Sequence, residues 1–339
     1  MSSTSTWRSP AGVRALLIAA LAGTVAVGSF YYFSDEPGDS TTQASQITDP
    51  AADSDTTSAE PIAPFTTADK GSCLTWDIDD DGEVSNFEQT SCDTEHRFEV
   101  SVREDLGTYP TSEFGRDADM PTQTRQAQLR EELCHTPTIR YLDGRYDSVG
   151  KYSIAPILPP AAAWEQGDRT MLCGLQVTDS TGTPQLNEGR AVEQDQANYA
   201  EPGECVVADS SNVVQTVDCG EDHAIEVTRV ENLAPVFPDS TPSIEDQDEH
   251  LKDVCTDAAI EFLGGEENLY QSTLQPYWGT LPAERWEGGS RTVNCGLVHA
   301  NNDGGFSSLK GSATAGRDGF TIDGEKPAEQ PERDPIREN

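Results

Sequence analysis

The stretch WEGGSRTVNCGL, residues 286–297, repeats an earlier stretch, WEQGDRTMLCGL, residues 164–175. Trp, Gly, Arg, Thr, Cys, Gly and Leu recur in both at the same spacing and without a gap. Chance does not readily produce such a match in a chain of 339 residues. We therefore interpret most of the chain as two copies of one module, and this duplication decides the fold.

The repeat extends toward the N-terminus from each of these two stretches. Each copy opens with Gly-x-Cys, continues with Cys-x3-His-x2-Glu-Val, and places a third cysteine before the one in the Trp stretch. The period of about 130 residues is far longer than the repeat of a solenoid protein. The sequence predicts these units: 1–34 a cytoplasmic N-terminus and anchor, 35–69 a disordered linker, 70–178 the first module, 179–200 a linker, 201–315 the second module, and 316–339 a disordered tail.

Each module is predicted to fold as strands, one helix and a returning strand, which is an α+β domain. Strands are expected at 213–217 and 224–230, and the final strands at 169–177 and 291–299. Apolar residues at helical spacing predict a helix over 251–262. In the first module Pro137 should break or kink the corresponding helix. Proline-containing loops are expected at 155–160 and 275–282.

The eight cysteines form two matching sets of four, and no pair has the C-x2-C spacing of zinc ribbons or redox sites. An even number in matching sets indicates disulfides formed in an oxidising compartment. Four cysteines allow three pairings in each module, and we favour the one in which each pair lies within a short unit. The favoured pairs are Cys73–Cys92, Cys134–Cys173, Cys205–Cys219 and Cys255–Cys295.

The formal net charge of −38 argues against nucleic acid as a partner, because proteins that bind it need basic patches. The simplest interpretation of the acidic surface is solubility.

Residues 15–34 contain no charged side chain, follow Arg8 and Arg14, and are long enough to span a bilayer. They predict an uncleaved signal-anchor with the N-terminus in the cytoplasm and the modules outside. The alternative is a cleavable signal peptide with a small-residue site at Ala26 to Gly28.

The order of Gly-x-Cys, Cys-x3-His-x2-Glu-Val, a helical Cys and a Cys followed by Gly311-Ser-Ala resembles the septum-formation domain family of actinobacterial membrane proteins. The resemblance covers 71–178 and 203–315, although no Gly-Ser-Ala was identified after Cys173. It implies a membrane-tethered, extracytoplasmic role in the cell envelope and in cell division, and it implies no established chemistry.

Two motifs have both a structural and a functional interpretation. His96-x2-Glu99 and His223-x2-Glu226 suggest a metal site or acid–base catalysis, but residues three apart on a strand point to opposite faces and do not converge. A hydrogen-bonded structural role is therefore favoured. The pairs Trp164–Arg169 and Trp286–Arg291 would form either a ligand platform or, as we favour, part of the core.

Residues 77–88 match the calcium-binding loop of EF-hands, with potential ligands Asp77, Asp79, Asp81, Glu83 and Glu88. An EF-hand needs a helix on each side of the loop, whereas strands are expected here. We favour an acidic hairpin turn over a calcium site, and expect binding in the millimolar range at most.

The sequence thus predicts a non-enzymatic, membrane-anchored scaffold or interaction protein of the cell envelope, linked to septum formation and to other envelope or division proteins. No cofactor is expected apart from the calcium considered above. The alternative is an extracytoplasmic binding module for a small ligand or wall fragment, with or without a dependence on calcium, and an enzyme ranks third.

Overall fold

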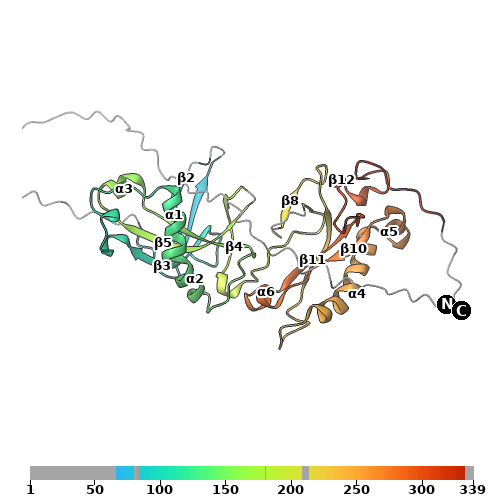
Figure 1. Ribbon diagram of the computed structural model, residues 1–339, viewed down its shortest axis with the longest axis horizontal. Coiled ribbons are helices and arrows are strands. Elements are labelled where there is room, and N and C mark those ends of the chain that lie inside the picture. Colours follow the sequence, from blue (N-terminus) through green and yellow to red (C-terminus); the bar gives the residue numbers. More distant parts are fainter. Residues whose placement is uncertain (1–65, 80–81, 83, 180, 208–213, 333–339) are drawn as a thin grey trace, which may run out of the picture.

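The computed structural model describes residues 66–332 except 80–81, 83, 180 and 208–213. The described part is mixed α+β, as predicted, with two antiparallel sheets side by side (Figure 1). Among these residues no helix has the length and apolar character needed to cross a bilayer. The predicted anchor at residues 15–34 lies outside the described residues.

The two sheets have the same strand order. The first runs β2-β1-β3-β5-β4, and the second, read from its other end, runs β8-β7-β9-β11-β10. The strands of the first sheet are β1 (Cys73–Ile78), β2 (Val84–Thr90), β3 (Phe98–Asp105), β4 (Tyr152–Ile157) and β5 (Thr170–Thr178). Those of the second are β7 (Cys205–Val207), β8 (Gln215–Val217), β9 (Ile225–Asn232), β10 (Gln275–Trp278) and β11 (Thr292–Val298). Each Trp stretch therefore leads into a central strand, β5 or β11.

The segments 155–160 and 275–282, predicted as loops, begin in the edge strands β4 and β10, and only 158–160 and 279–282 lie outside regular structure. Pro156 lies opposite Cys173, and Pro276 lies opposite Leu297. Proline cannot donate a backbone hydrogen bond, so it is tolerated in a sheet at an edge, where one side of the strand has no partner. The prediction was wrong for 155–157 and 275–278, because it considered proline without the strand's position in the sheet.

One long helical segment covers one face of each sheet. In the second module it is α4 (Ile244–Phe262), which starts with a capping box between Ser243 and Asp246 and buries Leu251, Cys255 and Ala259. In the first module the segment comprises α1 (Gln123–Leu129), a π-helical turn (Arg130–Cys134) and α2 (His135–Tyr141). Pro137 does not end the helix, because the π-helical turn before it rearranges the backbone bonds that its ring would disrupt.

All four predicted disulfides are present, and they account for all eight cysteines. Cys73–Cys92 and Cys205–Cys219 each close the hairpin that begins a module. Cys134–Cys173 and Cys255–Cys295 join the long helical segment to the central strand. Each pair of layers is thus linked covalently through its core.

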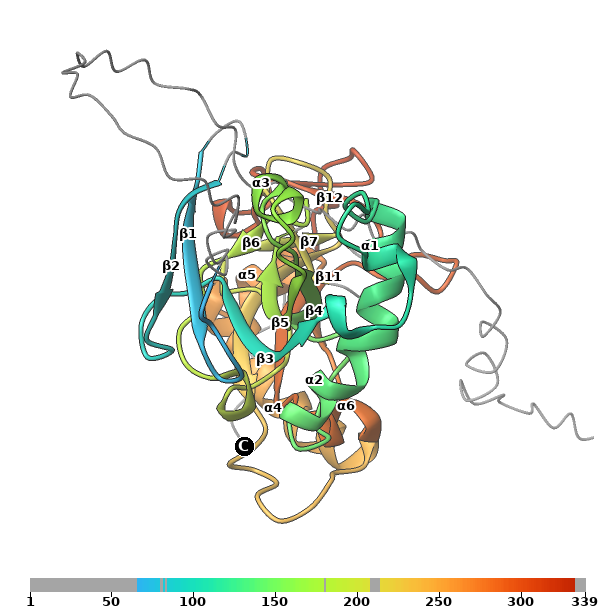
Figure 2. The same ribbon diagram turned by 90° about the vertical axis from the view of Figure 1, so that its left-hand side faces the viewer.

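Short helices and strands complete the fold. They are η2 (Leu106–Thr108), η3 (Ser112–Phe114), α3 (Ala161–Glu165), β6 (Pro184–Gln185), η5 (Ala191–Glu193), α5 (Glu266–Ser272), α6 (Ala283–Glu287), β12 (Leu309–Lys310), η6 (Ala313–Ala315) and β13 (Thr321–Ile322). In the end-on view the β1–β2 edge of the first sheet lies at one side and the helical segment α1–α2 at the other (Figure 2).

The segment predicted as a linker and part of the segment predicted as a disordered tail are packed against the modules. Within 179–200, β6 pairs with β5, and Ala191 is fully buried. Within 316–339, β13 pairs with β12, and Phe320 is 2% exposed in the second core. Isolated apolar residues in polar stretches carry these contacts, and composition averaged over a segment does not reveal them.

Candidate functional site

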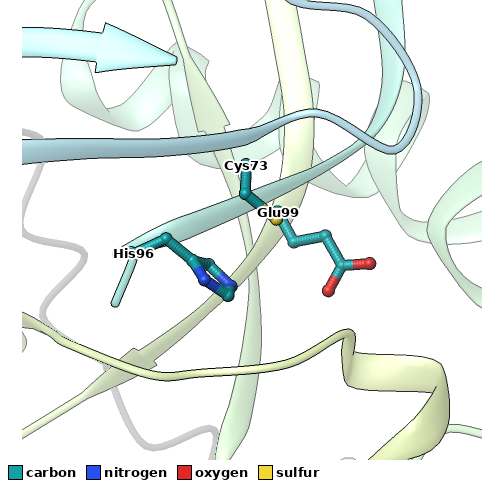
Figure 3. Close-up of side chains that lie close together, drawn as sticks. All are labelled: Cys73, His96 and Glu99. Carbon is teal, nitrogen blue, oxygen red and sulfur yellow. The ribbon is translucent and has the colours of Figure 1, made fainter. Parts of the chain in front are cut away.

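The side chains of His96 and Glu99 of the first module lie close together, beside the sulfur of Cys73 (Figure 3). One potential ligand atom from each residue lies within 4.8 Å of the others, and all three residues are buried. The expectation that His96 and Glu99 diverge was therefore wrong. His96 precedes β3 and forms an isolated bridge with Asn187, so the strict alternation of a strand does not apply between it and Glu99.

The contacts of Glu99 identify it as a structural anchor. One carboxylate oxygen accepts a hydrogen bond from the hydroxyl of Tyr141 in α2, and the other accepts one of 2.7 Å from the backbone N–H of Ala191. Burial, and then the hydrogen bond to Glu99, raise the pKa of Tyr141. The carboxylate thus joins the sheet, the helical segment and the chain that follows β5.

The group of Cys73, His96 and Glu99 does not form a metal site. Cys73 is bonded to Cys92, so it has no thiolate to offer. Both oxygens of Glu99 are engaged within the protein. The Nδ1 of His96 lies 2.8 Å from the carbonyl oxygen of Thr94, which fixes the ring. This leaves one imidazole nitrogen, which is too few ligands for a stable metal site.

The second module repeats the arrangement. Glu226 accepts hydrogen bonds from Ser312 Oγ at 2.5 Å and from the backbone N–H of Ala313 at 2.8 Å. The Nδ1 of His223 lies 3.0 Å from the carbonyl oxygen of Glu221, and its Nε2 is buried without a hydrogen-bond partner. Both His-x2-Glu motifs therefore hold a returning segment against the sheet.

The returning segments reveal a repeat that the sequence comparison missed. Gly189-Arg-Ala191 follows Cys173 at the same spacing as Gly311-Ser-Ala313 follows Cys295. The N–H of Gly189 donates to the carbonyl of Cys92 at 2.7 Å, and the N–H of Gly311 donates to the carbonyl of Cys219 at 2.6 Å. Both glycines have a positive φ, which glycine adopts most readily. The first module thus does have a Gly-x-Ala segment, within the predicted linker.

The Trp–Arg pairs belong to the cores. The Arg169 guanidinium stacks 4.0 Å from the centre of the Trp164 ring, and Arg291 lies 4.3 Å from that of Trp286. Arg169 also donates to the backbone carbonyls of five residues: Phe114, Gly115, Arg116, Trp164 and Asp168. Each Trp ring is covered by an arginine of its own module and is almost fully buried. This arrangement favours the structural interpretation over a ligand platform.

The EF-hand-like sequence forms the turn of the β1–β2 hairpin, with no helix on either side. Asp77 accepts a 2.6 Å hydrogen bond from the amide of Asn86, and Glu88 is exposed on β2 opposite Thr75. Asp81 and Glu83 lie outside the described residues. Among the residues the structure describes, the one group that converges as potential metal ligands contains none of Asp77, Asp79 and Glu88.

A buried polar network joins the two modules. Asp147 of the first module, 3% exposed, accepts hydrogen bonds from Arg285 Nε at 2.9 Å and Ser290 Oγ at 2.5 Å. The side chain of Gln196 accepts from the N–H of Asp147 and donates to the carbonyl of Arg145. The network was not predicted, because Asp147 and Arg285 are 138 residues apart and belong to none of the motifs that the two modules share.

Asp195, in the segment between the modules, forms further hydrogen bonds with the second module. Its carboxylate accepts hydrogen bonds from the N–H of Arg291 at 2.9 Å and from the hydroxyl of Thr292. Five residues later, the backbone of Ala200 forms two hydrogen bonds with the side chain of Asn294. The segment predicted as a linker is thus fixed to the first module by Asn187 to Ala191 and to the second by Asp195 to Ala200.

Comparison with known proteins gives one matching family model and two similar proteins. The family model described as septum formation matches residues 70–295. A single match spans both modules, so the expectation of a separate family copy in each module is not confirmed. No solved structure is significantly similar to the chain.

Uncharacterized membrane proteins from two strains of Mycobacterium tuberculosis, CDC 1551 / Oshkosh and ATCC 25618 / H37Rv, are each 34% identical over 280 residues. The aligned region covers 81% of this chain and 61% of each relative. The chain therefore matches less than two thirds of the length of these curated relatives.

Proposed function

Because this chain belongs to the septum formation family, we propose that it is a membrane-anchored, extracytoplasmic interaction protein of the cell envelope that acts in septum formation and cell division. The observation that carries the proposal is the family match, which extends over both modules. The relatives are described as membrane proteins, which is consistent with an anchor at residues 15–34.

The disulfides support a location outside the cytoplasm. Structural disulfides persist in oxidising compartments, and here all four lie in or beside the cores. The positive charges of Arg8 and Arg14 before the apolar stretch favour a cytoplasmic N-terminus. In this proposal the two modules face the wall and the division machinery.

A scaffold role agrees with how the motif residues are used. The histidines, glutamates, tryptophans and arginines that recur in both modules make contacts within the protein. The network around Asp147 holds the modules in one arrangement, as suits a protein that presents a fixed surface to partners. We therefore propose that the chain binds other envelope or division proteins and catalyses no reaction.

Localisation in dividing cells tests the proposal. The full chain carries a self-labelling tag that folds outside the cytoplasm, and photo-cross-linking followed by mass spectrometry identifies neighbouring proteins. We expect the label at division sites and cross-links to division or wall-synthesis proteins. A matched chain in which residues 15–34 are replaced by a polar sequence of the same length should lose both signals. Uniform labelling with no enrichment at division sites would contradict the proposal.

A further inference from the structure

The sheet face that lies away from the long helix differs between the two modules. In the first module this face is closed by a cluster whose members are at most 6% exposed: Ala68, Leu74, Trp76, Val84, Phe98, Val100, Ile157 and Leu172. Trp76 stacks on Phe87 at 5.6 Å between ring centres, and Phe87 packs against this cluster. The face is therefore an ordinary second core.

The corresponding positions of the second module carry smaller side chains. Leu74 lies opposite Phe98 where β1 pairs with β3, and Val206 lies opposite Ile225 where β7 pairs with β9. The Phe98 ring packs over Gly174 of the central strand, and Ile225 packs over Gly296 in the same way. Val in place of Leu and Ile in place of Phe reduce the side-chain volume on this face, where Ala200 and Val214 pack beside Val206, Val227 and Ile225.

A cleft of about 770 Å³ extends from this face past β10 to Ile244 and Asp248 in α4. Val206, Ile225 and Val227 form part of its floor, and Tyr277 and Phe306 form a wall, with their ring centres 5.1 Å apart and the planes at 76°. Burial raises the pKa of Tyr277, as expected in apolar surroundings. The size lies in the range of small-molecule sites, which are mostly apolar with a few polar groups.

The ionisable groups along this cleft favour a positive ligand. Its acids are Asp147, Asp248 and Glu284, and its one cationic side chain is Arg285. Arg285 is already paired with Asp147, so the charges that remain are the two exposed carboxylates of Asp248 and Glu284. Aromatic ring faces also attract cations, and this wall contains two.

We propose that the cleft of the second module binds a small organic cation with an apolar body, such as an amphiphilic amine. The apolar part lies over Val206, Ile225 and Val227, and the ammonium group lies near Asp248 and Glu284. Residues 146–149 of the first module complete the cleft, so both modules contribute to the site. This inference is independent of the role in septum formation.

A pair of fluorescent probes with one fluorophore and opposite charges tests the proposal on the purified full chain in detergent. Dansylcadaverine carries an ammonium group, and dansylglycine carries a carboxylate. We expect saturable fluorescence enhancement with dansylcadaverine and a Kd at least about tenfold higher with dansylglycine, a difference that shrinks as salt is added. Equal affinity for the two probes would overturn the charge preference, and no saturable binding would overturn the site.

Two sets of variants locate the binding. The double variant Val206→Leu/Ile225→Phe installs the side chains that close the first module, and should raise the Kd for dansylcadaverine at least about tenfold. Asp248→Asn/Glu284→Gln changes only exposed groups, and should weaken dansylcadaverine but not dansylglycine. Asp253→Asn/Glu287→Gln, also exposed, is the matched control and should bind as the unmodified chain does. Unchanged binding in both test variants would overturn the proposal. If Val206→Leu/Ile225→Phe folds poorly, unchanged binding in Asp248→Asn/Glu284→Gln alone would overturn it.

Discussion

Asp147 and Arg285 form an ion pair across the junction of the two modules, with Oδ2 2.9 Å from Nε and the Asp147 side chain only 2% exposed. Replacing Asp147 with Asn should keep the shape but leave Arg285 without its counter-charge. Breaking a buried pair on one side costs roughly 3 kcal/mol of unfolding free energy. Urea unfolding of residues 66–332 measures the loss. Asp253→Asn on the exposed face of α4 is the control, and equal stability of the two variants would show that the junction contributes little.

Sequence reasoning predicted much of this fold because the repeat supplied two independent views of one module. The α+β class and the disulfide pairs followed from the spacing of the cysteines and of the apolar residues, and the structure contains both. It failed where a contact depends on distant segments. Pro156 is tolerated because β4 is an edge strand, and Gly189-Arg-Ala191 was hidden in a polar stretch.

The candidate site was predicted less well than the fold. His96 and Glu99 were expected to diverge, because their positions relative to the start of β3 were not known, and the structure brings them together. The cleft of the second module was not predicted at all. It depends on the smaller Ile225 standing where the first module has Phe98. The two positions can be recognised as equivalent only when the register of the strands is known.

The Glu99 anchor should matter for stability rather than for chemistry. Glu99→Ala would leave the N–H of Ala191 and the hydroxyl of Tyr141 without their acceptor in a buried site. We expect a loss of roughly 2–4 kcal/mol of unfolding free energy. Glu88→Ala, on an exposed strand position, should change it by less than about 0.5 kcal/mol. Hydrogen exchange should also show faster exchange at residues 187–193 in the Glu99 variant, and protection equal to that of the unmodified protein would refute the anchor role.

The two Trp–Arg pairs should differ in how much they contribute. Arg169→Lys cannot reproduce five hydrogen bonds to backbone carbonyls, and should cost roughly 3 kcal/mol or more. Arg291 donates to the carbonyls of Trp286 and Ser290, so Arg291→Lys should cost about half as much. Thermal unfolding of the two variants side by side checks the order. A larger effect at Arg291 would contradict it.

Stability should fall at alkaline pH. Burial is the first cause that raises the pKa of Tyr141, Tyr146 and Tyr152 in the folded protein. A group with a raised folded pKa stabilises the fold fully below its unfolded value, about 10 for tyrosine, and the contribution is lost as the pH rises above that value. Urea unfolding between pH 7 and 11.5 should show the decrease beginning near pH 10. Tyr152→Phe should make it shallower, and an unchanged slope would assign the loss to other groups.

Calcium should bind residues 77–88 weakly at most, although their sequence matches an EF-hand loop. In an EF-hand the twelfth residue closes the cage with both carboxylate oxygens. Here Glu88 is exposed on β2 opposite Thr75, and the Asp77 carboxylate accepts a hydrogen bond from Asn86. Binding would have to break that bond and move Glu88 out of a paired strand. Calorimetric titration of residues 66–332 with calcium should therefore give a Kd in the millimolar range or no heat at all. Any heat that does appear should vanish in Asp79→Ala and persist in Asp253→Asn, an exposed acid on α4. Submicromolar affinity lost in Asp79→Ala would show that the loop rearranges into a true calcium cage, and the hairpin would then be the calcium-free state.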